Sequence, residues 1–478
     1  MYAKGMATEP DVELAAVRFV CELFARNRHL SEGPVICEAP EDTLEAIRLQ
    51  GIPAQGRDLD DVVAEMEHDV IGYGYNADHA RFLGFVPGPT SAISWLGDVI
   101  AAGYNRHAGS FANYPAGLAA EDTLLAWCTA QAGFPAETAG GLFVSGGSIA
   151  NLTALAAARD AMLAAEDWGR GVAYVSDQTH SSVAKGLHII GIPREHVHAI
   201  PCDDAWRMDV DALEAAIEAD RTAGLIPFAV VGTAGSTNTG SVDPLRVIAH
   251  VCRDQHLWMH VDGAFGASVL ITRYRDMLDG VELADSLSWD AHKWLFQTYS
   301  CGMVLMRDRK HLLATYSTHP EYLKDLKDRD DLVNPWDLGP ELTRPARGLK
   351  LWFTLQAMGT EGLAEAVEHG FTLARWAEDE ARKNPDIEIV SPAQMAMLNF
   401  RYAPAGLSEE QLDELNLDIS RRIVASGYAG VFTTELDGKK VLRICAIHPE
   451  AKEADMRGTI QRLNACFHES LGTGPKLS

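Results

Sequence analysis

The sequence predicts an α/β fold: a mostly parallel central sheet covered by helices, preceded by a helical segment and followed by a small α+β domain. From about residue 140 to residue 308, short β-rich runs alternate with helical stretches. This alternation is typical of a parallel sheet with helices on both faces. The run PFAVV is apolar throughout, as expected of a strand that is buried on both sides.

The individual elements can be predicted in chain order. Before the sheet, Val12–Asn27 and Leu59–Val70 have the apolar periodicity of amphipathic helices with acidic outer faces. The expected strands of the sheet are GLFVS, VAYVS, FAVVG, LWMHV, DSLSW and GMVLM, with helices over 149–165, 181–190 and 245–254. After Arg347, a long helix is expected to reach Lys383. Strands in IEIVSPAQMAMLNFRYA and VLRICAI then surround one further helix.

These elements predict three units along the chain. Residues 1–72 form an N-terminal helical dimerisation segment, residues 73–355 a large ligand-binding domain, and residues 356–478 a small C-terminal α+β domain. Between Thr318 and Leu342 the chain is rich in charged residues and contains prolines, which predicts a long surface loop. A loop of this length in a compact domain is often a functional lid.

Composition excludes several classes of function. Hydrophobic residues make up 47% and charged residues 23% of the 478 residues, which is typical of a soluble globular chain. No apolar run is long enough to cross a bilayer, and residues 1–20 lack the apolar core of a secretory signal, so we expect a cytoplasmic protein without a membrane partner. A formal net charge of −26 opposes binding to nucleic acid. The eight cysteines include no CxxC pair, which predicts buried free thiols and no metal site.

The residues that follow the predicted strands are candidates for a ligand site, because ligands bind beyond the carboxyl ends of parallel strands. GLFV leads into Ser145–Ser148 and then a helix, where backbone N–H groups can bind a phosphate. VAYVS leads to His180, and AVVGTAGST leads to Ser236 and Thr237. Taken singly, each of these is more often a tight connection or an ordinary polar residue.

Two ionisable residues favour a ligand site over that simpler interpretation. Asp262 follows the apolar run LWMHV, and a buried carboxylate needs a positive partner. Lys293 lies among apolar residues in SWDAHKWL, where an amine can lose its proton and attack a carbonyl, although such a lysine is usually a surface residue. A pyridinium ring with a phosphate tail would satisfy Asp262, Lys293, the small-residue turn and His180 together. The sequence therefore predicts pyridoxal phosphate (PLP) as cofactor.

Several stretches resemble the motifs of a known family, the group II PLP-dependent decarboxylases, which act on aromatic amino acids, histidine and glutamate. They are FVSGGSIANLTALAAARD, VSDQTHSSVAKGL, IPFAVVGTAGSTNTGSVDPL, HVDGAFGAS and SWDAHKWLF, and matching runs extend from about Pro53 to the C-terminus. Within the family, runs such as FVPGP, SWLGD and ELTRPARGLKLW are most similar to bacterial tryptophan decarboxylases. The resemblance implies the type I fold of PLP enzymes, which is like that of aspartate aminotransferase, with PLP bound in the large domain.

The resemblance also implies a role for each matching residue around the cofactor ring. Lys293 would be the Schiff-base lysine, and Asp262 would pair with the ring nitrogen. His180 would stack on one face of the ring and Ala264 would contact the other face. Thr237 would place a hydroxyl near the ring.

A second group of residues would surround the phosphate of the cofactor. By resemblance these are Gly147, Ser148 and His292. Asp290 departs from the asparagine that animal aromatic decarboxylases carry at this point of the motif. Because a carboxylate is unfavourable beside phosphate, Asp290 is expected to accept hydrogen bonds from backbone or hydroxyl donors.

The reaction implied by the resemblance is decarboxylation through a bond to Lys293, followed by return of a proton to Cα. In animal aromatic decarboxylases a tyrosine in a mobile loop of the partner subunit supplies this proton, and Tyr322 occupies that position in THPEYLKDL. Relatives with phenylalanine there, or with asparagine in place of the stacking histidine, form aldehydes instead. Tyr322 and His180 therefore favour simple decarboxylation in a homodimer whose active site lies at the interface.

Apolar and aromatic residues are expected to contact the substrate side chain. The segment HARFLGFVPGPTS supplies Phe82, Phe85, Val86 and Pro87. His107 begins a stretch, 107–114, that is expected to approach from the partner subunit. These residues suit an aromatic L-amino acid, with tryptophan favoured to give tryptamine and with phenylalanine and tyrosine as alternatives. An acidic substrate would need cations, and only Arg81 and Arg106 lie in or beside these stretches.

Other interpretations of the sequence remain open at this point. Arg344 and Arg347 in LTRPARGLK either bind a carboxylate or have a structural role near the loop. An aromatic aldehyde synthase could use the same scaffold. A non-catalytic PLP-binding homologue is disfavoured because Lys293 and Asp262 are both present. Aminotransferase or desulfurase chemistry is disfavoured by the phrase DAHKW and by Tyr322.

Overall fold

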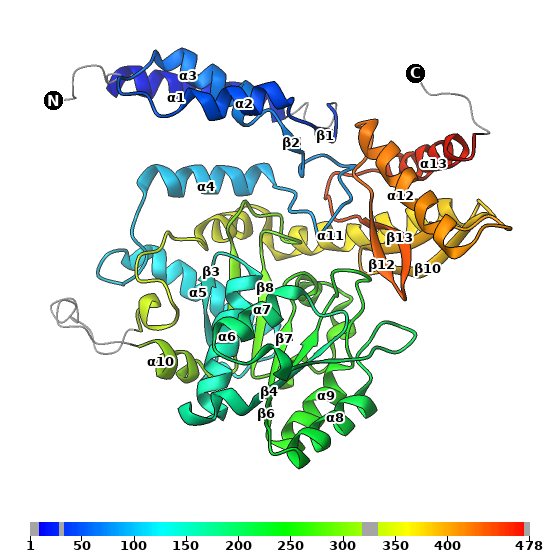
Figure 1. Ribbon diagram of the computed structural model, residues 1–478. Coiled ribbons are helices and arrows are strands. Elements are labelled where there is room, and N and C mark those ends of the chain that lie inside the picture. Colours follow the sequence, from blue (N-terminus) through cyan, green and yellow to red (C-terminus); the bar gives the residue numbers. More distant parts are fainter. Residues whose placement is uncertain (1–8, 28–32, 318–332, 473–478) are drawn as a thin grey trace.

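A seven-stranded sheet forms the centre of the computed structural model, which describes residues 9–27, 33–317 and 333–472 (Figure 1). Its strands are β3 (Gly140–Val144), β4 (Gly171–Ser176), β5 (Val197–Ile200), β6 (Ile226–Thr233), β7 (Trp258–Asp262), β8 (Ser286–Asp290) and β9 (Gly302–Met306). They lie in the order β3-β9-β8-β7-β6-β4-β5, and within this sheet only β9 runs antiparallel to its neighbours. The predicted α/β fold with a mostly parallel sheet is therefore confirmed.

Helices cover both faces of this sheet, as predicted. One face is covered by α6 (Gly147–Met162), α7 (Ser181–Ile189) and α10 (Lys310–Tyr316), and the other by α5 (Pro115–Gln131), α8 (Val210–Thr222) and α9 (Leu245–Gln255). Side chains alternate between two apolar cores along a strand. In β6, Phe228 packs in the core that contains Ala154, and Val230 packs in the core that contains Ile248.

The sequence pattern did not reveal β5 and α8. β5 is the edge strand of the sheet and buries only Ile200, so it lacks the apolar run of the central strands. α8 begins after Asp209, whose side chain accepts the N–H of Ala212, and it buries a narrow stripe that includes Leu213 and Ile217. Short 3₁₀ helices at 165–170, 194–196, 266–271, 275–278, 281–283 and 335–337 connect the larger elements.

The strand directions bring five connecting segments to one edge of the sheet. β3, β4, β6, β7 and β8 all run the same way, so their carboxyl ends lie side by side. The segments that follow these strands carry most of the polar residues that the sequence had marked as candidates. This edge is where a ligand is expected in an open α/β sheet.

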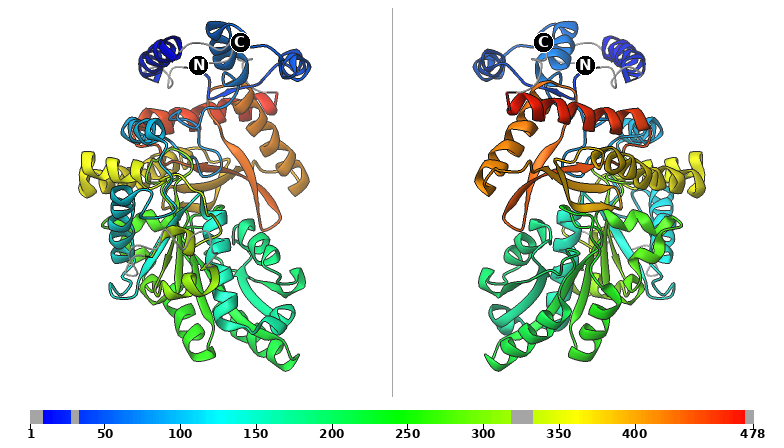
Figure 2. Two further views of the ribbon diagram at one scale, coloured as in Figure 1. Left: turned by 90° about the vertical axis from the view of Figure 1, so that its left-hand side faces the viewer. Right: turned by 90° about the vertical axis from the view of Figure 1, so that its right-hand side faces the viewer.

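The N-terminal segment is helical and buries little of its own surface. It contains α1 (Glu9–Asn27), β1 (Ile36–Cys37), α2 (Glu41–Gln50), α3 (Leu59–Glu65) and β2 (Gly74–Tyr75), and α4 (Ala92–Tyr104) follows it. The helix predicted over Leu59–Val70 changes to a π-helical turn at Met66. α2 and α3 bury no residues, and Val12 and Leu14 of α1 are exposed. Figure 2 shows these helices at the end of the molecule that lies opposite the large sheet.

The small domain is built on a four-stranded antiparallel sheet in the order β10-β11-β13-β12. Its elements are α11 (Leu349–Ala381), β10 (Ile387–Gln394), β11 (Met397–Tyr402), α12 (Glu409–Ala425), β12 (Phe432–Leu436), β13 (Lys439–Cys445) and α13 (Glu453–Ser470). The sequence analysis missed β12, although Asp437 and Gly438, both with positive φ, form the Asp-Gly turn that is typical of a hairpin.

The long helix α11 connects the two domains and bends once. Gly359 has φ 73° and ψ 169°, which is not helical. Before the bend, Phe353 packs closely against Gly97 of α4. After the bend, His369 Nε2 bonds the carbonyl of Ala451 at 2.7 Å, next to α13 of the small domain.

The cysteines are all free thiols, as predicted, but they are not all buried. The buried ones are Cys128, Cys252, Cys301, Cys445 and Cys466. The prediction is wrong for Cys21, which lies exposed on α1, and for Cys37 and Cys202, which are partly exposed. Within the ranges that the structure describes, no helix combines the length and apolar character needed to cross a bilayer.

Candidate active site

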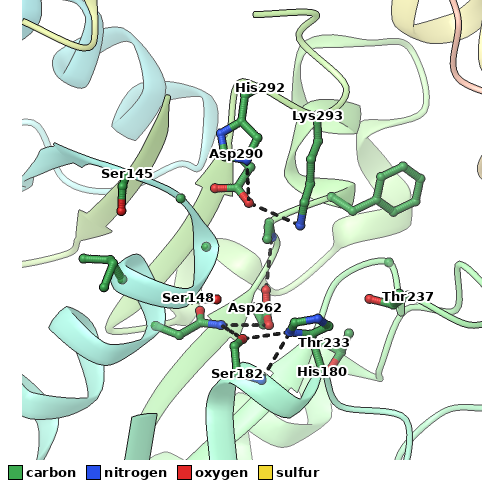
Figure 3. Close-up of a pocket in the computed structure, with 17 residues that line it drawn as sticks. Ser145, Ser148, His180, Ser182, Thr233, Thr237, Asp262, Asp290, His292 and Lys293 are labelled. Atoms are coloured by element: carbon green, nitrogen blue, oxygen red, sulfur yellow. Dashed lines mark hydrogen bonds and ion pairs between the residues drawn. The ribbon is translucent and has the colours of Figure 1, made fainter. Parts of the chain in front are cut away.

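A pocket of about 400 Å³ opens at the edge of the sheet where the carboxyl ends of the parallel strands meet (Figure 3). It brings together every residue that the sequence marked as a cofactor contact: Gly147, Ser148, His180, Thr237, Asp262, Ala264, Asp290, His292 and Lys293. Ser145, Gly146, Ile149, Asn151, Ser182, Thr233, Gly235 and Phe265 complete the lining. A cavity of this size suits a small molecule.

Asp262 is a buried carboxylate with only neutral hydrogen-bond donors around it. Its Oδ1 accepts hydrogen bonds from the backbone N–H of Ala264 (3.2 Å) and from Ser288 Oγ (3.1 Å), and its Oδ2 accepts one from Asn151 Nδ2 (3.0 Å). Among the described residues, no lysine or arginine forms an ion pair with it. Because a buried negative charge needs a positive partner, the pocket suits a ligand that brings a cation to Asp262.

The turn between β3 and α6 is shaped for an anion. α6 begins at Gly147, and no side chain caps its N-terminus. A Cβ atom on Gly147 would lie 2.9 Å from Asp290 Oδ2, and one on Gly146 would lie 3.0 Å from the His292 ring, so larger residues would disturb this side of the pocket. Glycine thus leaves the backbone N–H groups of the helix accessible, beside Ser145 and Ser148. This arrangement favours a phosphate.

Lys293 forms an ion pair with Asp290 on the side of the pocket opposite Asp262 (Figure 3). Lys293 Nζ lies 3.2 Å from Asp290 Oδ2, and the Asp290 side chain is 2% exposed. The expectation that Asp290 accepts backbone or hydroxyl donors is wrong. Its Oδ1 has no hydrogen-bond partner among the described residues, and its Oδ2 faces the amine instead. The reason is local: the turn after β8 places a lysine three residues further on the same side of the chain.

His292 is held as a hydrogen-bond donor toward the pocket. Its Nδ1 accepts the backbone N–H of Cys301 at 3.1 Å, so the proton of the neutral ring is on Nε2. Burial lowers the pKa of His292, and the nearby charge of Asp290 raises it only in part. Nε2 lies 3.7 Å from Asp290 Oδ2 and next to Gly146. A neutral N–H at this point can donate to a phosphate oxygen.

His180 and Thr237 border the pocket from β4 and β6. His180 precedes α7, and its Nδ1 accepts the backbone N–H of Ser182 at 3.2 Å and lies 2.8 Å from Ser182 Oγ. The carbonyl of Thr237 accepts a hydrogen bond from Arg443 Nη1 (2.5 Å), which belongs to β13. The small domain therefore supports this wall of the pocket.

Some residues of the site were not predicted, although the sequence contained a signal for two of them. His260 lies two residues before Asp262, so their side chains share one face of β7. Asn151 is a polar residue within the apolar run of α6 and must find a hydrogen-bond partner when it is buried. Ser182 and Ser288 gave no such signal, because a serine in the first turn of a helix or within a strand is ordinary.

Stability is expected to fall as the pH drops from about 6.5 to about 4, in part because of His260. Burial lowers the pKa of His260 from 6.5 to about 4, which the charge of Asp262 opposes. In this window the unfolded chain binds a proton that the folded chain does not, so His260 weakens folding by at most about 3 kcal/mol at the acid end. Urea unfolding across the window should show a shallower loss in His260→Gln than in the wild type. Equal losses would contradict the assignment.

The residues predicted to contact substrate do not line this pocket within one chain. Phe82 is buried and Phe85 is 52% exposed. Together with Tyr75 and Phe432 they form an aromatic cluster, with ring centroids of Phe85 and Phe432 5.1 Å apart. Val86 is partly buried and Pro87 is buried. His107 bonds Asn113 between α4 and α5. Tyr322 lies outside the described residues.

Both arginines of the LTRPARGLK segment have protein partners. Arg344 is buried and bonds both carboxylate oxygens of Glu121, at 2.8 and 3.2 Å. Arg347 bonds both oxygens of Glu341, at 2.7 and 2.8 Å. These bidentate pairs occupy the guanidinium groups, which favours the structural role over binding of a ligand carboxylate.

The donor set of the pocket fits PLP. Asp262 can pair with a protonated ring nitrogen, the N-terminus of α6 can bind the phosphate, and the Lys293 amine can bond to the aldehyde carbon. The groups that would bind the ring nitrogen, the phosphate and the aldehyde all line the same cavity.

Comparison with known proteins agrees with this chemistry. The family model of the pyridoxal-dependent decarboxylase conserved domain matches residues 40–403. The chain is 38% identical to aromatic-L-amino-acid decarboxylase of Bacillus atrophaeus, over 92% of each chain, and 30% identical to phenylacetaldehyde synthase of Arabidopsis thaliana, over 90% of each. The crystal structure of Oryza sativa TDC with PLP and tryptamine matches with a TM-score of 0.93 and 28% identity, covering 98% of this chain and 99% of that one. The chain belongs to the pyridoxal-dependent decarboxylase family, and its cofactor is pyridoxal 5′-phosphate.

Proposed function

We propose that this chain removes the α-carboxylate from an aromatic L-amino acid, with tryptophan as the favoured substrate and tryptamine as the product. The observation that carries the proposal is the placement of the Lys293 amine and the Asp262 carboxylate on opposite sides of one pocket, beside an uncapped helix N-terminus. The names of its relatives support an aromatic substrate: one is an aromatic-L-amino-acid decarboxylase, and one solved structure holds tryptamine.

In this proposal the protein binds and orients, while bound PLP supplies an electrophilic carbon for the amine and an electron sink for the breaking bond. Lys293 holds the cofactor and is displaced by the amine of the substrate. Asp262 keeps the proton on the ring nitrogen. The N-terminus of α6 and the Nε2–H of His292 bind the phosphate. His180 lies against the ring and limits how the substrate can turn.

Asp290 has a defined part in this scheme. In the protein alone, it pairs with the Lys293 ammonium at 3.2 Å. When Lys293 bonds to the cofactor it no longer offers an ammonium, and Asp290 then needs another donor. Asp290 therefore holds the Lys293 side chain in the pocket before the cofactor binds and is not itself a phosphate ligand.

The substrate side chain is proposed to lie against the segment 82–87 of the same subunit. Gly88, which follows this segment, packs so closely that an added Cβ would lie 2.6 Å from the carbonyl of His292. The segment thus passes beside the pocket. Phe82, Phe85, Val86 and Pro87 offer an apolar surface that suits an indole or phenyl ring.

An acidic substrate is disfavoured by the partners of the nearby cations. Arg81 Nε donates to the carbonyl of Tyr428 at 2.8 Å, and its Nη1 lies 3.4 Å from Asp455. Arg81 is therefore held by the small domain. Arg106, the other cation considered, lies exposed next to α4 and outside the lining of the cofactor pocket.

We propose that the active unit is a homodimer. Apolar side chains of α1 and α4 are exposed in the single chain: Val12, Leu14, Val17, Leu96, Val99, Ile100 and Tyr104. Exposed apolar residues gathered on a helix in this way are typical of an interface. In such a dimer His107 and the stretch that follows it would complete the substrate pocket of the partner subunit.

An aromatic aldehyde synthase is the second candidate, because the chain is also 30% identical to a phenylacetaldehyde synthase. Tyr322 and His180 favour the decarboxylase. A third candidate, a non-catalytic homologue, is disfavoured because both Lys293 and Asp262 are present in the pocket. The two enzymatic candidates are distinguished at Tyr322 and His180.

Tyr322→Phe is expected to change the product from amine to aldehyde. If the Tyr322 hydroxyl returns the proton to Cα after carbon dioxide leaves, its removal slows that step and leaves an electron-rich Cα. Dioxygen can then accept the electrons, and hydrolysis gives aldehyde, ammonia and hydrogen peroxide. Quantifying amine, aldehyde and peroxide under air will show the change. A variant that still forms only amine would refute the role of Tyr322.

Mixed dimers test whether Tyr322 crosses the interface. A Tyr322→Phe subunit retains Lys293, and a Lys293→Ala subunit retains Tyr322. If the tyrosine crosses, the mixed dimer contains one complete site and forms amine, whereas neither parent does so. A verified mixed dimer with no more amine formation than its parents excludes crossing.

The substrate is tested by incubating the PLP-loaded protein separately with tryptophan, phenylalanine, tyrosine and glutamate. Carbon dioxide and amine are expected in equal amounts, with the highest kcat/KM for tryptophan. Faster turnover of phenylalanine or tyrosine would keep the reaction and correct the substrate. Turnover of glutamate alone would overturn the proposal.

A further inference from the structure

A chain of hydrogen bonds runs through the core of the sheet and ends at Asp262. Trp258 Nε1 lies 2.9 Å from Ser286 Oγ, and Ser286 Oγ lies 2.8 Å from His260 Nδ1. His260 Nε2 lies 3.0 Å from Asn151 Oδ1, and Asn151 Nδ2 lies 3.0 Å from Asp262 Oδ2. All these residues are buried, with exposures between 0 and 6%. Trp258, His260 and Asp262 belong to β7, and they are joined through Ser286 of β8 and Asn151 of α6.

The direction of every hydrogen bond in this chain follows from its last member. The Asp262 carboxylate can only accept, so Asn151 directs its NH₂ group to Asp262 and its oxygen to His260 Nε2. The neutral His260 ring therefore carries its hydrogen on Nε2, and its Nδ1 accepts from Ser286, whose oxygen accepts the indole N–H of Trp258. Neutrality follows from burial, which lowers the pKa of His260 to about 4.

The Asn151 amide is therefore bonded on both of its sides. His260 donates to its oxygen, and its NH₂ group faces the pocket. There one hydrogen reaches Asp262 Oδ2, and Nδ2 also lies 3.2 Å from Ser182 Oγ. Ser182 can pass its hydrogen to His180 Nδ1 at 2.8 Å. The Asn151 amide thus bonds Asp262 directly and contacts His180 through Ser182.

We propose that His260 and Asn151 are positioning residues that hold the Asp262 carboxylate in the orientation needed to pair with the ring nitrogen of the cofactor. This inference rests on the proposed role of Asp262. Asn151 acts directly on the carboxylate, and His260 acts through Asn151 by preventing the amide from turning over. Neither residue touches the reacting atoms of the substrate.

The hydrogen-bonded chain that ends at Asp262 accounts for the polar residues buried beside the sheet. Burying a histidine, a serine and an asparagine costs free energy unless every donor and acceptor is satisfied. A lysine or arginine at the same place would also hold Asp262, but it would balance the negative charge within the protein. The neutral chain orients the carboxylate and leaves its charge for the cofactor.

The test compares two cofactors in binding experiments that do not depend on turnover. The probes are PLP and 1-deazapyridoxal phosphate, in which a C–H group replaces the ring nitrogen. Both share the phosphate, the ring and the aldehyde that bonds to Lys293. The ratio of their dissociation constants therefore isolates the contact between Asp262 and the ring nitrogen. The wild type is expected to bind PLP on the order of ten- to hundredfold more tightly than the analogue.

Three variants should change this ratio in a set order. Asn151→Ala removes the amide and should bring the ratio close to one. His260→Phe keeps the ring shape but leaves the amide free to turn, so the ratio should fall by about threefold or more. His260→Gln can donate to Asn151 and accept from Ser286, and it should restore most of the ratio. If His260→Phe does not fold, Ser286→Ala serves in its place, because it only removes one oxygen atom.

Ser268→Ala is the matched control for a general loss of packing. Ser268 accepts the indole N–H of Trp289 at 3.0 Å in the core on the other face of the sheet, and both residues are fully buried. This variant also leaves a buried indole N–H without a partner, so it should lower the melting temperature. It has no link to Asp262 and should leave the cofactor ratio unchanged.

The possible outcomes distinguish the role of Asp262 from the positioning role of Asn151 and His260. A wild type that does not distinguish PLP from the deaza analogue would overturn the proposed role of Asp262 itself. A wild type that distinguishes them, with an unchanged ratio in Asn151→Ala and His260→Phe, would overturn the positioning role alone. An equal fall of the ratio in Ser268→Ala would also overturn it, because the effect would then reflect packing.

Discussion

Lys293→Ala is expected to abolish the visible absorbance of protein-bound PLP and to lower turnover by several orders of magnitude. The amine of Lys293 faces the pocket, and no other lysine lines it among the described residues. Without that amine the cofactor is held only by its phosphate and ring contacts, and the covalent route into the reaction is lost. Absorbance spectra of the purified variant after PLP addition, together with assays of amine formation, measure both effects.

Borohydride reduction provides the chemical control for this prediction. Reduction of the PLP-loaded wild type followed by peptide mapping should place the label on Lys293. Lys310→Ala is the matched variant, because Lys310 is an exposed lysine that pairs with Asp308 on the surface. It should retain full absorbance and turnover. Recovery of the label on any lysine other than Lys293 would refute the assignment.

Asp262→Asn is expected to reduce turnover by about 10²–10³-fold while the protein still binds PLP. Asparagine has nearly the same shape and can keep the hydrogen bonds from Ala264 and Ser288. It cannot hold a proton on the ring nitrogen by charge, so the breaking bond loses its electron sink. Steady-state kinetics should show the loss in kcat rather than in KM.

Asp243→Asn separates this electrostatic effect from the cost of changing a buried carboxylate. Asp243 is also buried and accepts the backbone N–H groups of Met208 (2.8 Å) and Thr233 (2.7 Å). Its replacement should reduce stability and leave kcat almost unchanged, because the residue does not line the pocket. Near-normal turnover of Asp262→Asn would exclude its pairing with the ring nitrogen.

The central fold could be predicted because buried parallel strands are apolar at nearly every position. β6 stands out in the sequence in this way, and so does the antiparallel strand β9. β8 is buried but apolar only at alternate positions, Leu287 and Trp289. The edge strand β5 buries only Ile200 fully, so local hydrophobicity does not distinguish it from a loop. β12 was missed for the same reason, since only Leu436 at its end is buried.

Residues of the pocket could be predicted from the sequence where a charged residue stands in an apolar stretch. Asp262 follows an apolar strand, and Lys293 lies in an apolar turn. Asn151, His260 and Ser286 matter through one another, because their hydrogen bonds join α6, β7 and β8. Asn151 and His260 are unusual as buried polar residues, but which groups they bond depends on how the elements pack and cannot be inferred along the chain. The Asp290 error has the same origin: its partner was inferred from the ligand, whereas the turn supplies Lys293.

The bend in α11 gives the small domain a mechanical link to the pocket. Because the helix leaves its regular path at Gly359 alone, two torsion angles of one residue set the angle between its halves. The far half carries the small domain, and that domain grips the loop after β6 through Arg443 on the Thr237 carbonyl and Asn399 on the Asn238 carbonyl. A small rotation at Gly359 would therefore shift the loop after β6, which borders the pocket. The position of this loop depends on a helix that does not itself line the pocket.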